Sequence, residues 1–178
     1  MPFKVMDTDI PEVKFLEIQR FDDERGFFEE IYRNKIFHEL GINNKFNQIN
    51  LSFSKKNVFR GFHFQLNPEP QGKLVTVISG KIIDYAIDLR KESKNYKKNV
   101  HYELTNGKML FIPEGFAHGF LAMEDSYVLY LTTNEFNNKL DSGIRYNDNE
   151  LNIKLPDDII VSKKDKSLKY LKDINLDF

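Results

Sequence analysis

The chain has 178 residues, enough for one sizeable hydrophobic core, and we expect a single domain over 1–178. Its 26 basic and 27 acidic side chains are well mixed and give a formal net charge of −1, which argues against a nucleic-acid partner. The sequence has no cysteine, so disulfide frameworks and zinc ribbons are excluded. No stretch resembles a signal peptide or approaches the roughly 18 apolar residues of a membrane span, which predicts a cytoplasmic protein without a membrane partner.

Short apolar or alternating runs follow one another along the chain and are separated by turn-forming residues. They are Val13–Arg20, Gly26–Arg33, Phe46–Ser54, Val58–Gln65, Lys73–Arg90 and four further runs at 100–104, 108–113, 118–123 and 127–133. Many short strands rich in β-branched and aromatic residues are typical of an antiparallel sandwich or barrel. Within Lys73–Arg90, the pair Ser79-Gly80 suits a tight hairpin turn. The fold class we predict is all-β, a cupin-like double-stranded β-helix (jelly roll) with a few short helices.

Two short helices are expected. The first is Asn34–Leu40, which Gly41 follows as a C-terminal cap. The second begins at Ser162-x-x-Asp165, which resembles a capping box, and would continue through Lys166–Leu171.

The run Val58–Gln65 reads "VFRGFHFQ" and places Arg60 and His63 among three phenylalanines. Strict alternation would put these two polar side chains on opposite faces, but a bulge at Gly61 could bring them together. With Lys73 ten residues further on, they would form a cationic cluster suited to an anionic guest or to developing negative charge. The alternative is that Arg60 and Lys73 are ordinary surface charges and that His63 is a hydrogen-bonded core residue.

The segment "PEGFAHGF" (Pro113–Phe120) resembles the second motif of the cupins, whose histidine, here His118, often binds a metal. The first cupin motif should then supply His-x-His, but the matching residues are His63, Phe64 and Gln65. A three-ligand metal site cannot be assembled from these motifs, so we expect no metal and a hydrogen-bonded His118.

Six motifs in this order resemble the dTDP-4-dehydrorhamnose 3,5-epimerase family, over about Val13 to Lys172. They are "DERGFFEEIY", "QINLSFSKKNVFRGFHFQ", "QGKLVTVISGKIIDYAIDLRKES", "FIPEGFAHGF", "GIRYND" and "IIVSKKD". The resemblance implies a metal-free enzyme without a cofactor, which forms a homodimer. It also implies a core over about 13–140 with 141–178 packing over the barrel. The implied activity inverts C3 and C5 of a dTDP-linked 4-keto-6-deoxy-glucose-type sugar, for rhamnose-type deoxysugar biosynthesis.

The same resemblance implies roles for four catalytic residues. His63 would be the base, Asp165 the carboxylate that orients it, Lys73 the cation that holds the enolate oxygen, and Tyr130 the acid on the opposite face. Two plainer interpretations stay open, in which Asp165 merely caps its helix and Tyr130 is a core aromatic.

Residues for substrate and nucleotide binding follow from the resemblance as well. They are Arg25, Phe28 and Glu30 at the thymine end, often across the dimer interface, with Gln48, Asn50 and Arg60 for pyrophosphate and sugar, and His118, Phe136 and Asp141. Asp141 stands where the family usually has Glu, and Glu135-Phe136 replaces a pair of tyrosines, so Phe136 can stack but has no hydroxyl.

Other functions stay open, and the missing hydroxyl bears on the first of them. One is a mono-epimerase acting at C3 or C5 alone, and another uses a different nucleotide sugar such as a GDP-linked heptose. A 3,4-ketoisomerase and a non-catalytic sugar- or metal-binding cupin are the remaining alternatives.

Overall fold

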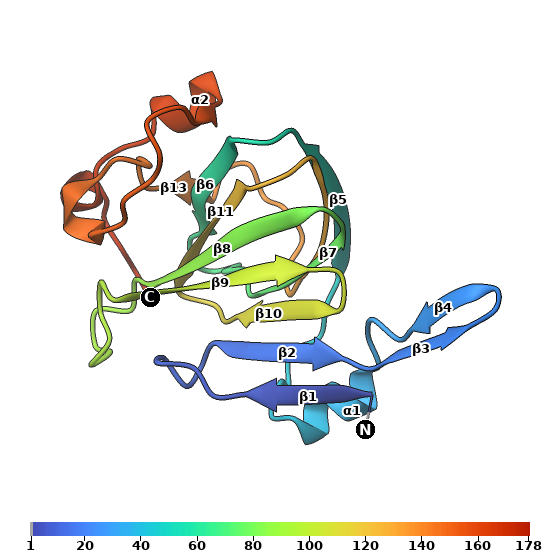
Figure 1. Cartoon of the computed structure of the whole chain (residues 1–178). Coiled ribbons are helices and arrows are strands. Elements are labelled where there is room, and N and C mark those ends of the chain that lie inside the picture. The colour runs from blue at the N-terminus through green and yellow to red at the C-terminus, as the bar shows by residue number, and fades with distance from the viewer. Residues whose placement is uncertain (1) are drawn as a thin grey trace.

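Two antiparallel sheets packed face to face form the body of the molecule in the computed structural model, which describes residues 2–178 (Figure 1). The first sheet has the order β1 (Phe3–Met6), β2 (Lys14–Ile18), β10 (Lys108–Ile112), β7 (Lys73–Ser79), β12 (Ser126–Thr132) and β5 (Gln48–Ser54). The second has the order β13 (Asp141–Gly143), β6 (Val58–Gln65), β11 (Phe116–Ala122), β8 (Lys81–Asp88) and β9 (Asn99–Thr105), with β14 (Ile160–Val161) pairing in parallel with β6. The predicted all-β, cupin-like jelly roll is confirmed.

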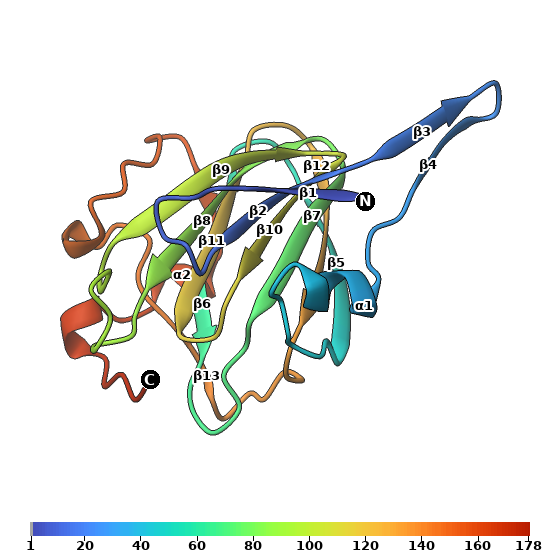
Figure 2. The same ribbon diagram turned by 90° about the horizontal axis from the view of Figure 1, so that it is seen from below.

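A third, two-stranded sheet projects away from this body (Figures 1 and 2). It consists of β3 (Arg20–Asp23) and β4 (Gly26–Glu29), joined by a short turn. Its phenylalanines are exposed, and Phe28 retains 65% of its accessible surface. Apolar side chains on a projecting hairpin indicate a surface that something else covers.

Three apolar clusters hold the layers together. One lies between the two sheets and includes Val75, Ala86 and Leu110. A second packs α1 (Asn34–Glu39), with its fully buried Phe37, against the first sheet. The third packs the C-terminal segment against the second sheet and involves Phe62. That segment contains η1 (Asn149–Leu151), α2 (Lys163–Lys166) and η2 (Leu171–Asp173).

The first predicted helix is confirmed with its cap, whereas the second is shorter than predicted. Gly41 adopts φ +77° after α1, and its N–H donates to the carbonyl oxygen of His38 at 3.0 Å. Ser162 caps α2 as expected, since its Oγ accepts from the Asp165 N–H at 3.0 Å. The extension through Leu171 is wrong, because Lys169 instead forms a β-bridge with Ile144. Tertiary pairing therefore overrides local helix propensity here.

The predicted hairpin at Ser79-Gly80 is wrong. β7 belongs to the first sheet and β8 to the second, so the dipeptide carries the chain between sheets. Gly80 adopts φ +92°, and a Cβ there would lie 2.4 Å from the carbonyl oxygen of Asp125. The glycine indicates a tight turn correctly, but it does not specify which strands pair. Among residues 2–178, no helix has the length and apolar character needed to cross a membrane.

Candidate active site

A bulge in β6 brings Arg60 and His63 to the same cavity. In the pairing of β6 with β11, His118 lies opposite His63 and Phe120 lies opposite Arg60. An interval of two residues on β11 therefore matches an interval of three residues on β6, which is one extra residue on β6. Gly61 has φ +137°, and a Cβ there would lie 2.5 Å from Cα of Gly119. The irregularity predicted at Gly61 is therefore confirmed. Arg60 is anchored by Nε, which donates to Oγ of Ser54 at 2.9 Å.

The cavity between the sheets has a volume of about 280 Å³. Its lining residues come from both sheets and from the segment that carries α2, and they are Ser52, Arg60, His63, Lys73, His118, Phe120, Tyr130, Ser162, Lys164 and Asp165. Six residues singled out in the sequence, distant along the chain, meet here: Arg60, His63, Lys73, His118, Tyr130 and Asp165. This convergence of titratable groups makes the cavity the candidate active site.

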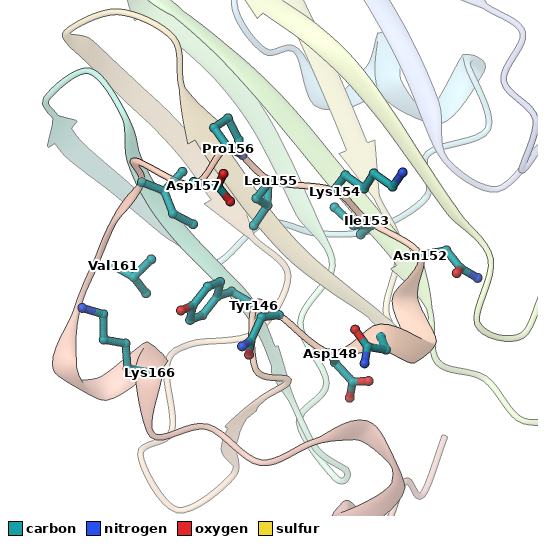
Figure 3. A pocket seen from close by; sticks show the side chains of 13 residues that line it. Tyr146, Asp148, Asn152, Ile153, Lys154, Leu155, Pro156, Asp157, Val161 and Lys166 are labelled. Atoms are coloured by element: carbon teal, nitrogen blue, oxygen red, sulfur yellow. The ribbon is translucent and has the colours of Figure 1, made fainter.

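A larger cavity, of about 730 Å³, lies within the C-terminal segment (Figure 3). Its lining includes Tyr146, Asp148, Lys154 and Lys166. Both carboxylate oxygens of Asp148 are already used, since they accept from the backbone N–H groups of Glu150 and Leu171. The larger volume therefore does not by itself make this cavity a reaction site. The smaller cavity is the better candidate because several titratable side chains converge in it.

His63 and Asp165 form a hydrogen-bonded pair across the cavity wall. Nε2 of His63 lies 2.8 Å from Oδ1 of Asp165, whose Oδ2 accepts from the Gly61 N–H at 3.3 Å. Burial raises the pKa of the Asp165 carboxyl, but its bonds to His63 and Gly61 outweigh this and hold the pKa below its usual range. If the Nε2–H donates to the carboxylate, Nδ1 is left as the unprotonated nitrogen of His63. Ser162 Oγ caps the Asp165 N–H, whereas the Asp165 carboxylate bonds to His63 and Gly61.

Lys73 is buried on β7, with 8% of its surface accessible, so its interpretation as a surface charge is wrong. Its Nζ donates to the carbonyl oxygen of His63 at 3.5 Å. Burial lowers the pKa of Lys73 to about 8, and the carboxylates of Asp84 and Asp141 oppose this shift. At neutral pH most of the amine is therefore a buried cation, close to the histidine.

Tyr130 enters the cavity from the first sheet, whereas His63 enters it from the second. Burial raises the pKa of the Tyr130 hydroxyl above 10, although Arg60 opposes this shift. The hydroxyl is therefore protonated at neutral pH. An imidazole and a protonated hydroxyl on opposite walls are groups suited to inversion at carbon, which requires a base on one face and an acid on the other.

His118 and Asp84 form a second buried pair, and Asp84 was missed in the sequence analysis. Nε2 of His118 lies 2.6 Å from Oδ1 of Asp84, so the expected hydrogen bond of His118 is present. Burial lowers the pKa of His118 below 6.5 despite the attraction of Asp84. A usable signal existed, because Asp84 interrupts the otherwise apolar run Ile82–Ile87, "IIDYAI". No three His, Cys, Asp or Glu side chains within 2–178 are grouped as metal ligands would be.

Four of the remaining predicted residues lie outside the lining of the cavity and are hydrogen-bonded to one another or, for Asp141, to a lining residue. Gln48 donates to Oδ1 of Asn50 at 2.8 Å and accepts from the backbone N–H of Phe136 at 2.8 Å. Phe136 has 54% of its surface accessible. Asp141 accepts from Nζ of Lys164, a cavity residue, at 2.5 Å.

The other three lie on or just after the projecting hairpin, away from the cavity of their own chain (Figure 2). Arg25 is paired with Asp23 at 2.6 Å, and Glu30 is paired with Arg33. Phe28 has no role in the core of this chain. Within one chain, Arg25, Phe28 and Glu30 are therefore not brought to the candidate site.

A cupin-like jelly roll whose cavity brings together a His–Asp pair, a buried lysine and an opposed tyrosine has the groups that acid–base chemistry needs. Residues 7–173 match the family model described as dTDP-4-dehydrorhamnose 3,5-epimerase. The enzyme of that name from Methanothermobacter thermautotrophicus is 42% identical over an alignment 178 residues long, which covers 96% of this chain and 96% of that one. The chain belongs to the dTDP-4-dehydrorhamnose 3,5-epimerase family and is an isomerase.

Solved structures agree with this assignment. A dTDP-6-deoxy-D-glucose-3,5-epimerase from Legionella pneumophila, in complex with dTDP-4-keto-L-rhamnose, has a TM-score of 0.93 and 36% identity, with 97% of this chain and 95% of that one covered. A dTDP-4-dehydrorhamnose 3,5-epimerase from Bacillus anthracis, with TDP and PPi bound, has a TM-score of 0.92 and 40% identity, covering 95% and 99%.

Proposed function

We propose that this protein inverts C3 and C5 of a dTDP-linked 4-keto-6-deoxy-glucose without a metal or another cofactor, and so produces a rhamnose-type 4-keto sugar. The observation that carries the proposal is the opposition of His63, paired with buried Asp165, to Tyr130 across one cavity. Membership of the family and similarity to enzymes solved with dTDP-linked ligands support the substrate class. We regard residues 1–178 as one domain that acts in the cytoplasm, where nucleotide-linked sugars are made.

Each inversion proceeds through an enolate. Nδ1 of His63 takes the proton from the carbon next to the C4 carbonyl, the C–H electron pair becomes a C=C bond, and the carbonyl electrons move to oxygen. The buried ammonium of Lys73 stabilises this oxyanion. The Tyr130 hydroxyl then gives its proton to the opposite face, and the carbonyl reforms. Proton exchange with solvent restores His63 and Tyr130 for the next inversion.

Asp165 supports this chemistry by stabilising the imidazolium that forms on His63. Its low pKa keeps it ionised at neutral pH, and its hydrogen bond fixes the ring and the tautomer. His118, neutral because of its lowered pKa, is suited to a hydrogen bond with the sugar. Arg60 is suited to the diphosphate because a guanidinium binds phosphate through two parallel hydrogen bonds.

The nucleotide-binding part of the proposal requires a homodimer. The outer face of β5 exposes Ile49, Leu51 and Phe53, with accessible fractions of 67%, 62% and 44%. Tyr127 on the neighbouring strand packs its ring 4.9 Å from Phe53 and extends this apolar face. An apolar face of this kind on an edge strand favours a second copy as the occupant. The β3–β4 hairpin would then bring Arg25, Phe28 and Glu30 to the partner's nucleotide, while Gln48, Asn50, Phe136 and Asp141 serve the chain's own site.

A mono-epimerase is the second candidate, and Phe136 is the observation that favours it. The backbone N–H of Phe136 donates to Gln48, and the exposed side chain of Phe136 offers a ring for stacking but no hydroxyl. If a hydroxyl at this position is needed for one of the two carbons, only one centre would be inverted.

Turnover of dTDP-4-keto-6-deoxy-glucose in D₂O separates these functions. The proposal predicts deuterium at both C3 and C5 of the product, read by NMR and mass spectrometry. Deuterium at a single carbon would identify a mono-epimerase, and migration of the carbonyl to C3 would identify a ketoisomerase. No exchange, with dTDP still bound, would contradict the proposal, and the GDP-linked 4-keto sugar serves as the comparison substrate.

A further inference from the structure

The inner face of β8 carries a carboxylate where the fold would otherwise place an apolar side chain. Ile82, Asp84 and Ala86 point the same way, and Ile82 and Ala86 belong to the cluster between the sheets. Asp84 has no accessible surface. Aspartate is rarely buried completely unless it is paired, so its presence here calls for a chemical reason.

The two oxygens of Asp84 have different surroundings. Because Ala86 pairs with His118 and Asp84 with Phe120, Asp84 and His118 are diagonal neighbours on one face of the sheet. Oδ1 of Asp84 accepts a hydrogen bond from His118 Nε2 at 2.6 Å. Oδ2 is buried and has no hydrogen-bond partner among residues 2–178. The histidine therefore engages only one of the two oxygens of this carboxylate.

The negative charge of Asp84 also attracts the ammonium of Lys73. The charged and titratable side chains facing this region are Arg60, His63, Lys73, His118, Tyr130, Asp141, Lys164 and Asp165. Burial lowers the pKa of Lys73 to about 8, and the attractions that raise it come first from Asp84 and then from Asp141. A buried amine without these carboxylates would lose its proton at a lower pH.

We propose that Asp84 is a positioning residue for the epimerisation proposed above, which fixes His118 through Oδ1 and supplies the buried negative charge that keeps Lys73 cationic. Asp84 acts through these two residues and lies behind them in the sheet, so it does not need to contact the sugar. The inference rests on the proposed function, because only a protonated Lys73 stabilises the enolate oxygen.

The test is the pH profile of kcat/KM for Asp84→Asn, since asparagine retains an acceptor for His118 but removes the charge. In the wild type we expect activity to decline above a pH of about 8, where Lys73 loses its proton. His118 titrates below 6.5 and Tyr130 above 10, so neither accounts for this decline. In Asp84→Asn the decline should begin about one pH unit lower, so the loss of activity should be roughly fivefold greater at pH 8 than at pH 6.

Asp88→Asn is the matched control. Asp88 is also fully buried on β8, but its carboxylate is bound by Arg90 and Ser93. This variant should lose stability and keep the wild-type position of the alkaline decline. An Asp84→Asn profile lowered equally at every pH would overturn the proposal, because it would show a purely structural role.

NMR titration of the Lys73 ammonium reads the same effect without turnover. A Lys73 pKa of about 8 in the wild type, reduced in Asp84→Asn, is the expected result. Titration of wild-type Lys73 below pH 6.5 would contradict the proposal even if the variant does not fold. If the wild type fails to epimerise, the proposed function fails, and the titration still decides whether Asp84 keeps Lys73 charged.

Discussion

At the scale of single residues, the site depends on Gly61 as much as on the groups that react. Its φ of +137° and its close approach to Gly119 let β6 present both Arg60 and His63 to the cavity. Residues other than glycine rarely adopt such a backbone conformation. At this position Gly119 also leaves no room for a Cβ atom.

We therefore predict that Gly61→Ala destabilises the protein by about 3 kcal/mol and sharply lowers kcat. Gly26→Ala is the control, because Gly26 has φ +124° but a Cβ there would meet no atom of residues 2–178 within 4 Å. The control should cost about 1 kcal/mol, from backbone strain alone. Equal losses in urea unfolding for the two variants would show that the contact with Gly119 is unimportant.

The sequence was informative about residues whose type conflicts with their surroundings. Arg60 and His63 stand out in an aromatic strand, and the glycine between them suggests how they meet. Asp84 stands out by the same reasoning, but its alternation with Ile82 and Ala86 becomes meaningful only when the inward face of β8 is known. The family resemblance was needed for Tyr130 and Asp165, whose local patterns are equally typical of a core tyrosine and a helix cap.

At the scale of elements, β5 has two faces with different tasks. Its inner face carries Gln48, Asn50 and Ser52, toward the cavity, while its outer face exposes Ile49 and Leu51. Strand alternation produces this division directly. The same strand can therefore serve substrate binding and association of two copies.

We predict that the wild type is a dimer and that Leu51→Asp is a monomer, because the carboxylate would have to be desolvated in the proposed interface. Analytical ultracentrifugation measures this directly. Ile160→Asp is the control, since Ile160 is similarly exposed, at 56%, but lies on β14 beside the second sheet. A wild-type monomer, or a Leu51→Asp variant that remains dimeric, would contradict the proposed interface.

Local signals predicted the helix caps better than they predicted how far α2 extends or which strands pair. Ser162 and Gly41 were correctly identified as caps, because a cap is made by neighbouring residues. The end of α2 and the partner of β7 depend on contacts with distant segments. Ile144 bridges Lys169, and β12 and β10, rather than β8, flank β7.

At the scale of the whole molecule, the cavity is assembled from parts that no single segment contains. The first sheet supplies Lys73 and Tyr130, the second supplies His63 and His118, and the C-terminal segment returns over β6 to supply Asp165. His63 and Asp165 are 102 residues apart in the chain. Spacing in the sequence could not predict this contact, which follows from the packing of the C-terminal segment on the second sheet.

The central claim is that His63 removes the protons at both carbons, and deuterium incorporation by His63→Ala tests it most directly. The variant should incorporate no deuterium at C3 or C5 of dTDP-4-keto-6-deoxy-glucose in D₂O, while it still binds dTDP. His101→Ala is the control, because His101 is exposed on β9, outside the cavity, and its loss should leave both exchanges at the wild-type rate. Continued exchange at either carbon in His63→Ala would contradict the account.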